Sequence, residues 1–208
     1  MKRLLWSLLF LTVTVQAQIH QARANPACES AIDAASVTSV VPNGLLHAIA
    51  IVESGRPDPR SGTIQPWPWT IDVGGQGYYF PTKAAAISAV RTLMAAGINS
   101  IDVGCMQINL SYHPAAFRNL DQAFDPMANA RYAAVFLTRL YDSSLDWTKA
   151  AGAYHSQTPT LAQPYQNAVL AHWQPVGASK RYKAMASWED YGGPKSWEDF
   201  ATGLKGHR

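Results

Sequence analysis

Charged residues are scarce in this chain of 208 residues. Asp, Glu, Lys and Arg together make up 15% of it, and the formal net charge is +3. Lys2 and Arg3 supply two of these charges, so the chain without residues 1–17 carries only +1, which is +3 less two. Because nucleic-acid binding depends on clustered Lys and Arg, we exclude that class. A mild basic bias still fits a substrate with scattered carboxylates.

Several motifs of common enzyme classes are also missing. There is no Gly-x-Ser-x-Gly segment of a serine hydrolase and no Gly-rich phosphate-binding loop. The six His occur at positions 20, 47, 113, 155, 172 and 207, without the spacing of a metal site. We therefore expect neither a metal nor a cofactor.

Cysteine is rare, with only Cys28 and Cys105 in the chain. They lie too far apart, and without a neighbouring His pair, to indicate a zinc site. In an oxidising compartment such a pair favours a disulfide over the alternative, two buried thiols. That disulfide would close a loop of about 78 residues and stabilise the fold by about 4 kcal/mol.

No hydrophobic run is long enough to span a membrane comfortably. The longest, 4–15, follows Lys2 and Arg3 and is followed by Val15-Gln16-Ala17. This is the arrangement of a secretory signal peptide over 1–17, with cleavage as late as residue 24 as a second candidate. Since no Cys stands where a lipoprotein signal needs one, we expect an exported protein that does not span the membrane after cleavage.

Helical periodicity dominates the remaining chain and predicts one mainly helical α+β domain over about 26–176. A β-hairpin is indicated by 69–73 and 76–80, which flank the turn residues Gly74 and Gly75. The helices that we expect cover 28–39, 45–54, 82–96, 114–120 and 126–142, the last of these capped by Asp125, with two more beginning after Asp146 and Thr158. The apolar stripe of the final helix is Tyr165, Val169 and Trp173, and 55–62 is expected to be a polar, Pro-rich loop.

The last segment, 177–208, is predicted to be a weakly ordered tail. Its Ser187-Trp188-Glu189-Asp190 sequence recurs as Ser196-Trp197-Glu198-Asp199. Docking on a partner, a short helical clasp and chance all stay open as explanations of this repeat.

The most informative stretch is Ala48-Ile49-Ala50-Ile51-Val52-Glu53-Ser54-Gly55. It predicts a buried helix that ends at Glu53, with Gly55 closing it in the left-handed conformation. Loss of water and the negative end of the helix dipole both raise the pKa of a carboxyl in that position. A raised pKa suits a general acid. On this stretch alone, a solvated Glu at a frayed helix end is the alternative.

Aromatic residues gather in expected loops, in the hairpin and at helix ends. They are Trp67, Trp69, Tyr78, Tyr79, Phe80, Tyr112 and Tyr154. Flat ring faces beside Asn and Gln donors are typical of a saccharide cleft, while packing in the core is the alternative for each ring.

Three separated segments resemble the motifs of lytic transglycosylases of the SLT-domain type, in the lysozyme-like superfamily. Glu53-Ser54 follows an apolar helix, as in the first motif. Gly104-Cys105-Met106-Gln107-Ile108-Asn109 is similar to the second, Gly-Leu-Met-Gln-Ile-Asn. Ala153-Tyr154-His155-Ser156 is similar to the third, Ala-Tyr-Asn followed by a small residue. The resemblance covers about 40–175.

The resemblance implies a lysozyme-like domain with a small β-hairpin insertion, in a small single-domain periplasmic enzyme. Its substrate would be the glycan strands of peptidoglycan. Such small members serve trans-envelope machines, which makes a secretion, conjugation or flagellar assembly the expected partner. We expect a monomer.

The resemblance also implies roles for particular residues. Glu53 would be the only catalytic carboxyl. It would protonate the β-1,4 oxygen between N-acetylmuramic acid (MurNAc) and N-acetylglucosamine (GlcNAc). As a base, it would then help the muramoyl 6-hydroxyl to form 1,6-anhydroMurNAc. Ser54 and Tyr154 would hydrogen-bond the carboxyl or the sugar. The subsites would be lined by Met106, Gln107 and Asn109, with Trp69 and Tyr79 as stacking platforms.

Two rival functions stay open. A hydrolytic muramidase on the same fold would need a second carboxylate, for which Asp58, Asp72 and Asp102 are candidates by their proximity in the sequence. The other rival is a non-catalytic glycan-binding adaptor, against which the acid at Glu53 argues.

This chain departs from the motifs at two positions. Cys105 replaces the usual Leu, which a disulfide with Cys28 explains. His155 replaces the usual Asn, and an imidazole can become charged below about pH 6.5. We therefore predict a pH dependence that Glu53 alone does not explain.

Overall fold

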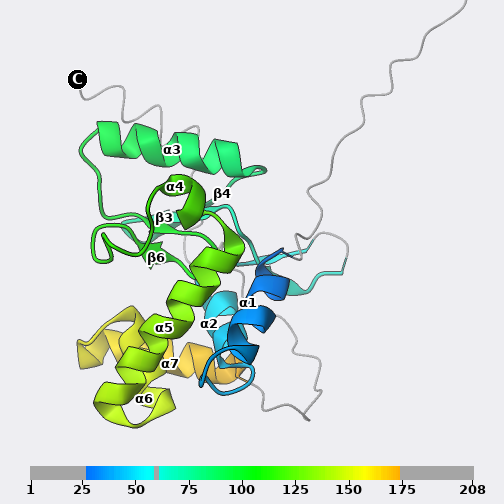
Figure 1. The fold of residues 1–208 in the computed structure, drawn as a ribbon, viewed down its shortest axis with the longest axis vertical. Helices are drawn as coiled ribbons and strands as arrows, with labels where there is room; N and C mark the ends of the chain where they lie inside the picture. Colours follow the sequence, from blue (N-terminus) through cyan, green and yellow to red (C-terminus); the bar gives the residue numbers. More distant parts are fainter. Residues whose placement is uncertain (1–26, 59–60, 174–208) are drawn as a thin grey trace, which may run out of the picture.

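The computed structural model describes residues 27–58 and 61–173 (Figure 1). The predicted signal peptide and the tail with its repeat lie outside these residues. The helices are α1 (Ala27–Val37), α2 (Leu45–Ser54), α3 (Lys83–Ala95), α4 (Leu120–Ala123), α5 (Pro126–Ser144), α6 (Trp147–His155) and α7 (Pro159–His172). The strands are β1 (Gly55–Pro57), β2 (Ile64–Pro66), β3 (Thr70–Val73), β4 (Gln76–Tyr79), β5 (Asp102–Val103) and β6 (Ile108–Asn109). The predicted mainly helical α+β class is confirmed.

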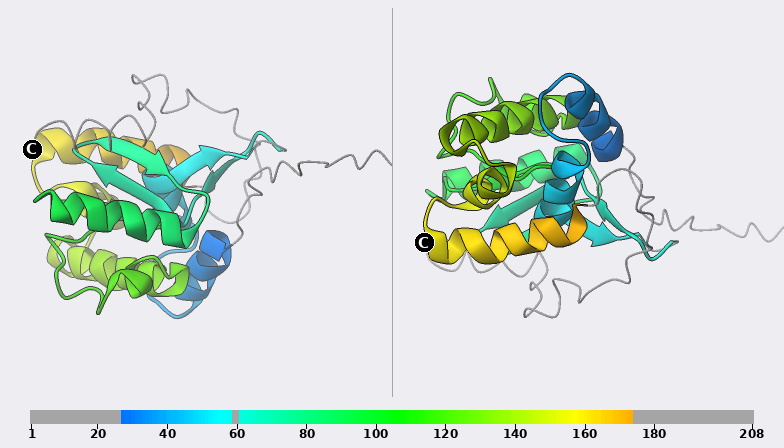
Figure 2. Two further views of the ribbon diagram at one scale, coloured as in Figure 1. Left: turned by 90° about the horizontal axis from the view of Figure 1, so that it is seen from above. Right: turned by 90° about the horizontal axis from the view of Figure 1, so that it is seen from below.

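Five helices, α1, α2, α5, α6 and α7, form a helical lobe around one hydrophobic core. Helix α2 lies at its centre (Figure 2), as expected for a sequence that is apolar on nearly every side. Leu45, Leu46 and Ile49 are completely buried there. The C-terminal end of α2 faces the strands, which places Glu53 at the edge of the lobe.

The second lobe, here called the sheet lobe, joins the antiparallel sheet β4-β3-β5-β6 to α3 and α4. In the view from above, the hairpin of β3 and β4 lies between α3 and α7 (Figure 2). The hairpin was predicted, and its turn residues Gly74 and Gly75 have φ of 65° and 83°. Both values need glycine in a two-residue turn of this kind.

The strand register gives the sheet an apolar face and a polar face. Ile71 pairs with Tyr78 and Val103, and these three side chains are buried against the α3 side. Val103 also pairs with Ile108, which is buried in the core of the helical lobe. The next row in register has the opposite orientation, because side chains alternate along a strand. That row consists of Gly77, Asp72, Asp102 and Asn109. We call this face the polar floor.

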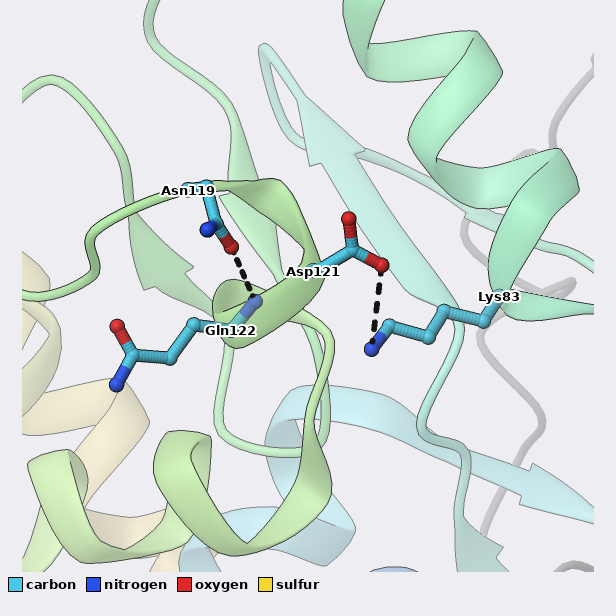
Figure 3. A network of polar contacts seen from close by, with 4 residues as sticks. All are labelled: Lys83, Asn119, Asp121 and Gln122. Carbon is cyan, nitrogen blue, oxygen red and sulfur yellow. Dashed lines mark hydrogen bonds and ion pairs between the residues drawn. The ribbon is translucent and has the colours of Figure 1, made fainter.

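Helices α3 and α4 are also connected on the surface (Figure 3). Lys83 Nζ lies 3.6 Å from Asp121 Oδ1, while Asn119 caps α4 by accepting a hydrogen bond from the Gln122 N–H at 2.9 Å. The Asp121 side chain is 71% exposed, so this ion pair contributes well under about 1 kcal/mol. The cap and the core beneath it hold α4 in place.

The disulfide joins Cys28 of α1 to Cys105, which lies 77 positions further along the sequence, and their Cα atoms are 5.7 Å apart. Both cysteines are completely buried. The bond connects the first helix of the helical lobe to the loop between β5 and β6, and so fastens the two lobes beside Glu53. This pairing was the favoured prediction from the two cysteines.

Three local predictions were wrong. Gly55 is extended, with φ −63° and ψ 131°, and begins β1 instead of closing α2 in the left-handed conformation. A polar loop was expected over 55–62, but its first three residues form β1, which pairs with β2. The predicted helix over 114–120 consists of turns, and the helix begins only at Leu120, after its cap Asn119. Short helices depend on such caps more than on apolar spacing.

Within the described ranges, no helix has both the length and the apolar character needed to cross a membrane.

Candidate active site

Glu53 occupies the last turn of α2, where the helical lobe meets the polar floor. Its side chain is partly accessible to solvent. Burial of the carboxyl raises its pKa to about 8, and the nearby carboxylates of Asp102 and Asp72 add to this effect. A carboxyl with that pKa is protonated at neutral pH. Among the carboxyls of the described residues, Glu53 therefore has the charge state that a general acid needs.

Among the described residues, Tyr165 provides the one side-chain hydrogen bond to that carboxyl. Its phenol, on α7, donates to Glu53 Oε1 at 2.5 Å and lowers the pKa of Glu53 against the larger effect of burial. The Tyr165 ring stacks on His155 of α6, with centroids 4.9 Å apart and planes 9° from parallel. The sequence placed Tyr165 only in the apolar stripe of its helix, so its contact with Glu53 was missed.

Asp72 and Asp102 lie side by side on the polar floor. They are register partners on β3 and β5, so both side chains project from the same face. Burial raises the pKa of Asp102 to about 6 and also raises the pKa of Asp72. His155 is close enough to act electrostatically on Asp72. The floor therefore brings two carboxyls towards Glu53 from the opposite lobe.

The loop that joins β5 and β6 has a backbone conformation that its sequence explains. Gly104 has φ 84°, and a Cβ there would lie 2.6 Å from the Asn129 side chain, so only glycine fits. Gln107 has φ 46° and donates from Nε2 to the carbonyls of Gly104 and Thr70. Its side chain thus closes the turn that its own backbone makes.

Asn129, on α5, fixes the same loop from beneath. Its Nδ2 donates to the carbonyls of Val103 and Ala123, and its Oδ1 accepts from the Met106 N–H at 2.8 Å. Asn129 is completely buried, and nothing in its position within the α5 pattern pointed to this role. The loop is therefore held by hydrogen bonds on one side and by the disulfide on the other.

The sequence profile of the transglycosylase SLT domain matches residues 30–169. This match covers about two thirds of the chain.

The chain belongs to the transglycosylase SLT domain family.

No curated protein and no solved structure matches it. The family assignment agrees with the three motifs, which the fold brings together around Glu53. Membership of this family indicates a transglycosylase function that acts on peptidoglycan.

Two predicted substrate contacts of the SLT domain are corrected by burial. Ser54 is completely buried, and its hydroxyl donates to the Cys105 carbonyl at 2.7 Å instead of to Glu53. Met106 is also completely buried and cannot line a subsite directly. Tyr154 lies beside Glu53, but its phenol donates to the Met106 carbonyl at 2.8 Å. Ser54 and Tyr154 thus connect the three motifs to one another.

The two amides of the second motif are also engaged. Asn109 donates to Ser100 Oγ and accepts from the N–H groups of Ser111 and Tyr112. Gln107 differs, because its buried Oε1 accepts no hydrogen bond from any residue that the structure describes. An acceptor in that state has a capacity that a donor from solvent or substrate would satisfy.

Of the two predicted aromatic platforms, Tyr79 lies on the face of the polar floor, whereas Trp69 packs against the core of the sheet lobe. Trp69 is half-buried and meets Trp67 edge to face, with centroids 5.7 Å apart. Tyr79 is half-buried too, and its phenol donates to the Gly55 carbonyl at 2.9 Å. The guanidinium of Arg56 lies over the Tyr79 ring. His155, by contrast, is exposed at the end of α6.

In the portions of the SLT domain that the structure describes, no three His, Cys, Asp or Glu side chains are grouped as a metal site requires. Asp58, the remaining candidate for a second carboxylate, is buried in the β1–β2 connection and accepts from the Ser61 N–H.

Proposed function

We propose that this protein is a peptidoglycan lytic transglycosylase that cleaves the β-1,4 bond between MurNAc and GlcNAc, with Glu53 acting first as acid and then as base. The observation that carries this proposal is the raised pKa of Glu53, about 8, in a family of transglycosylases. A neutral carboxyl at the edge of a sugar-binding cleft can give its proton to a glycosidic oxygen.

In the first step, Glu53 transfers its proton to the bridging oxygen while the bond from that oxygen to C1 of MurNAc breaks. The carboxylate that results accepts the hydrogen bond from Tyr165, which is already in place. The negative charges of Asp72 and Asp102 favour the positive charge that develops at C1. The leaving GlcNAc departs with the proton as a new 4-hydroxyl.

In the second step, the 6-hydroxyl oxygen of the same MurNAc attacks C1, and its proton passes to Glu53. The product is 1,6-anhydroMurNAc, no water is consumed, and Glu53 returns to its neutral form. The raised pKa of Glu53 supports both steps, because such a carboxyl is an effective base once it is ionised. The enzyme thus needs no external nucleophile.

The experiment that tests this proposal is the digestion of purified peptidoglycan by the wild type and by Glu53→Gln, with mass spectrometry of the products. We expect anhydro-muropeptides from the wild type and none from the variant, since the amide cannot donate an acidic proton. Reducing ends that are heavier by one water would reject the anhydro product. Equal cleavage by both proteins would reject the role of Glu53.

A hydrolytic muramidase is the second candidate, because the polar floor supplies Asp72 and Asp102. Both carboxyls are close enough to raise the pKa of Glu53, and a second carboxylate is what a hydrolase uses to stabilise C1 or to activate water. Asp72→Asn and Asp102→Asn separate the two candidates. A hydrolase should lose its reducing-end product in one of these variants, whereas a transglycosylase should continue to form anhydro ends, with a lowered alkaline limit.

The expected location in the periplasm and the expected partnership with a secretion, conjugation or flagellar assembly are part of the same proposal. They are supported by the predicted signal sequence and by the substrate of the family. Fractionation of cells that carry the tagged full-length chain tests the location, and crosslinking followed by mass spectrometry tests the partnership.

A further inference from the structure

Arg56, three residues after Glu53, is fixed between two aromatic rings. Its guanidinium carbon lies 4.7 Å from the ring centroid of Trp67 and 5.2 Å from that of Tyr79. Each ring is itself anchored: Trp67 Nε1 donates to the Phe80 carbonyl, and the Tyr79 phenol donates to the Gly55 carbonyl. The cation therefore has a defined place before any ligand arrives.

This cation has no anionic partner among residues 27–58 and 61–173. The one ion pair there joins Lys83 to Asp121, and the Arg56 guanidinium makes no hydrogen bond to a described residue. The guanidinium lies over the faces of the two rings, so these contacts do not use the N–H groups at its edge. A half-buried arginine in this state has five donors in the planar arrangement that matches a carboxylate.

Its position relates it to the polar floor. Tyr79 is separated from Gly77 by one residue on β4, so it shares the face that carries Asp72 and Asp102. One end of the floor is therefore acidic and the other bears the cation held over Tyr79. An anionic group of a substrate on this floor is repelled by the acidic end and attracted by Arg56.

We propose that Arg56 binds a carboxylate of the peptide stem that muramoyl residues of peptidoglycan carry, and that it makes the enzyme prefer strands with charged stems. This inference rests on the proposed function, because it concerns the same substrate. The sugar rings themselves are uncharged, so the stems supply most of the negative charge of such a strand. Arg56 has no acidic partner among residues 27–58 and 61–173, so its planar donors can receive a stem carboxylate.

The experiment compares three substrates: intact strands, strands whose stem carboxylates are converted to amides with carbodiimide and ammonia, and strands stripped of stems by an amidase. We expect the wild type to cleave intact strands with a kcat/KM about tenfold higher than amidated strands, as for one charge-assisted hydrogen bond. Arg56→Gln should cleave both about equally. Arg56→Lys, which keeps the charge, should retain part of the preference.

Arg91→Gln is the matched control, because Arg91 is an exposed arginine on α3, across the sheet from the floor; it should keep the full preference. Equal cleavage of intact and amidated strands by the wild type overturns the proposal without any variant. Stripped strands lack the stem but retain a lactyl carboxylate. If Arg56→Gln lowers kcat/KM by the same factor on stripped and on intact strands, the assignment of Arg56 to the stem is overturned.

Failure of the proposed function has a different signature, namely a wild type that cleaves none of the three substrates. In that case, co-sedimentation of the wild type with intact and with amidated insoluble peptidoglycan tests the Arg56 site without turnover. Weaker binding to the amidated material in the wild type, but not in Arg56→Gln, supports the site. Equal binding overturns it.

Discussion

The phenol of Tyr165 donates a hydrogen bond of 2.5 Å to Glu53 Oε1, across 112 positions of sequence. Burial disfavours the ionised carboxyl, while this hydrogen bond favours it, and the balance is a pKa of about 8. An acid that is too strongly buried would be a poor proton donor. Tyr165 thus limits the rise in the pKa and stabilises the anion that proton transfer leaves behind.

Tyr165→Phe should separate these two effects. Without the donor, the ionised form of Glu53 is less stable, so its pKa should rise above the wild-type value of about 8. The alkaline limit of activity should therefore move to higher pH. The carboxyl also loses its positioning contact, and kcat should fall about ten- to a hundredfold. The pH–rate profile of kcat/KM measures both.

Tyr141→Phe is a suitable control, since Tyr141 is half-buried and stacks on Trp147 at the far end of α5. It should leave the profile of the wild type unchanged. If Tyr165→Phe lowers kcat without moving the alkaline limit, the phenol contributes to position alone.

Glu53→Gln should stabilise the fold near neutral pH. The folded protein keeps the proton of Glu53 up to about pH 8, whereas the unfolded chain releases it near the ordinary value of 4.5. Between these values the unfolded state binds fewer protons, so the stability of the wild type falls as the pH rises. The amide lacks this penalty, which is at most about 3 kcal/mol at pH 7.

Urea unfolding of both proteins at pH 4 and pH 7 measures this difference. Glu53→Gln should exceed the wild type in unfolding free energy at pH 7 and match it at pH 4. An equal difference at the two values would mean that the substitution acts through packing, and that the carboxyl is not protonated in the folded protein.

Much of the helical lobe could be predicted from the sequence, because its helices are marked at both ends. Asp125 and Asp146 cap α5 and α6 as expected, and the bounds of α2 agree with its apolar pattern. The Gly74-Gly75 hairpin was equally well marked. Local signals of this kind determine local structure.

The site was less predictable, since its contacts join distant segments. Glu53 and the second motif were identified, but Tyr165 gave no signal beyond its place in a helical stripe, and Asp72 and Asp102 were brought together only by strand register. The burial of Ser54 and Met106 depends on how α2 meets the loop around Cys105. These contacts and this burial depend on how distant segments pack together, which the spacing of residues along the chain does not predict.

His155→Asn should change the acidic limb of the pH–rate profile. His155 stacks on Tyr165, which contacts Glu53, and it acts electrostatically on Asp72. A positive charge on the imidazole favours the ionised forms of the carboxyls near it. It should therefore reduce the fraction of Glu53 that carries the proton needed for catalysis. The asparagine variant carries no such charge. Superimposable acidic limbs in the two proteins would contradict this prediction.

Removal of the disulfide by replacing Cys28 and Cys105 together with Ala should lower the unfolding free energy by about 4 kcal/mol. The bond connects α1 to the loop before β6, so its loss should also loosen the site. Activity should then be lost at temperatures well below the melting temperature of the variant. Thermal unfolding and activity, measured over the same temperatures, test this. The single variants are poorer tests, since each leaves one buried thiol without its partner.

Two glycines near the site should respond oppositely to alanine. A Cβ at Gly55 would lie 2.2 Å from the Ile51 carbonyl oxygen and 2.7 Å from Ile64 Cγ2, so Gly55→Ala must displace the end of α2 or strand β2. It should cost about 2 kcal/mol or more of unfolding free energy and should move Glu53. A Cβ at Gly77 meets no atom within 4 Å.

Gly77→Ala should therefore keep or slightly raise the stability, because alanine restricts the unfolded chain. Gly77 lies beside Asp72 on the polar floor, so the added methyl should occupy space that a sugar ring needs. We expect a raised KM with unchanged unfolding. Comparison of KM and urea unfolding in the two variants tests whether the glycan lies on this floor: an unchanged KM in a stable Gly77→Ala protein would place the glycan elsewhere.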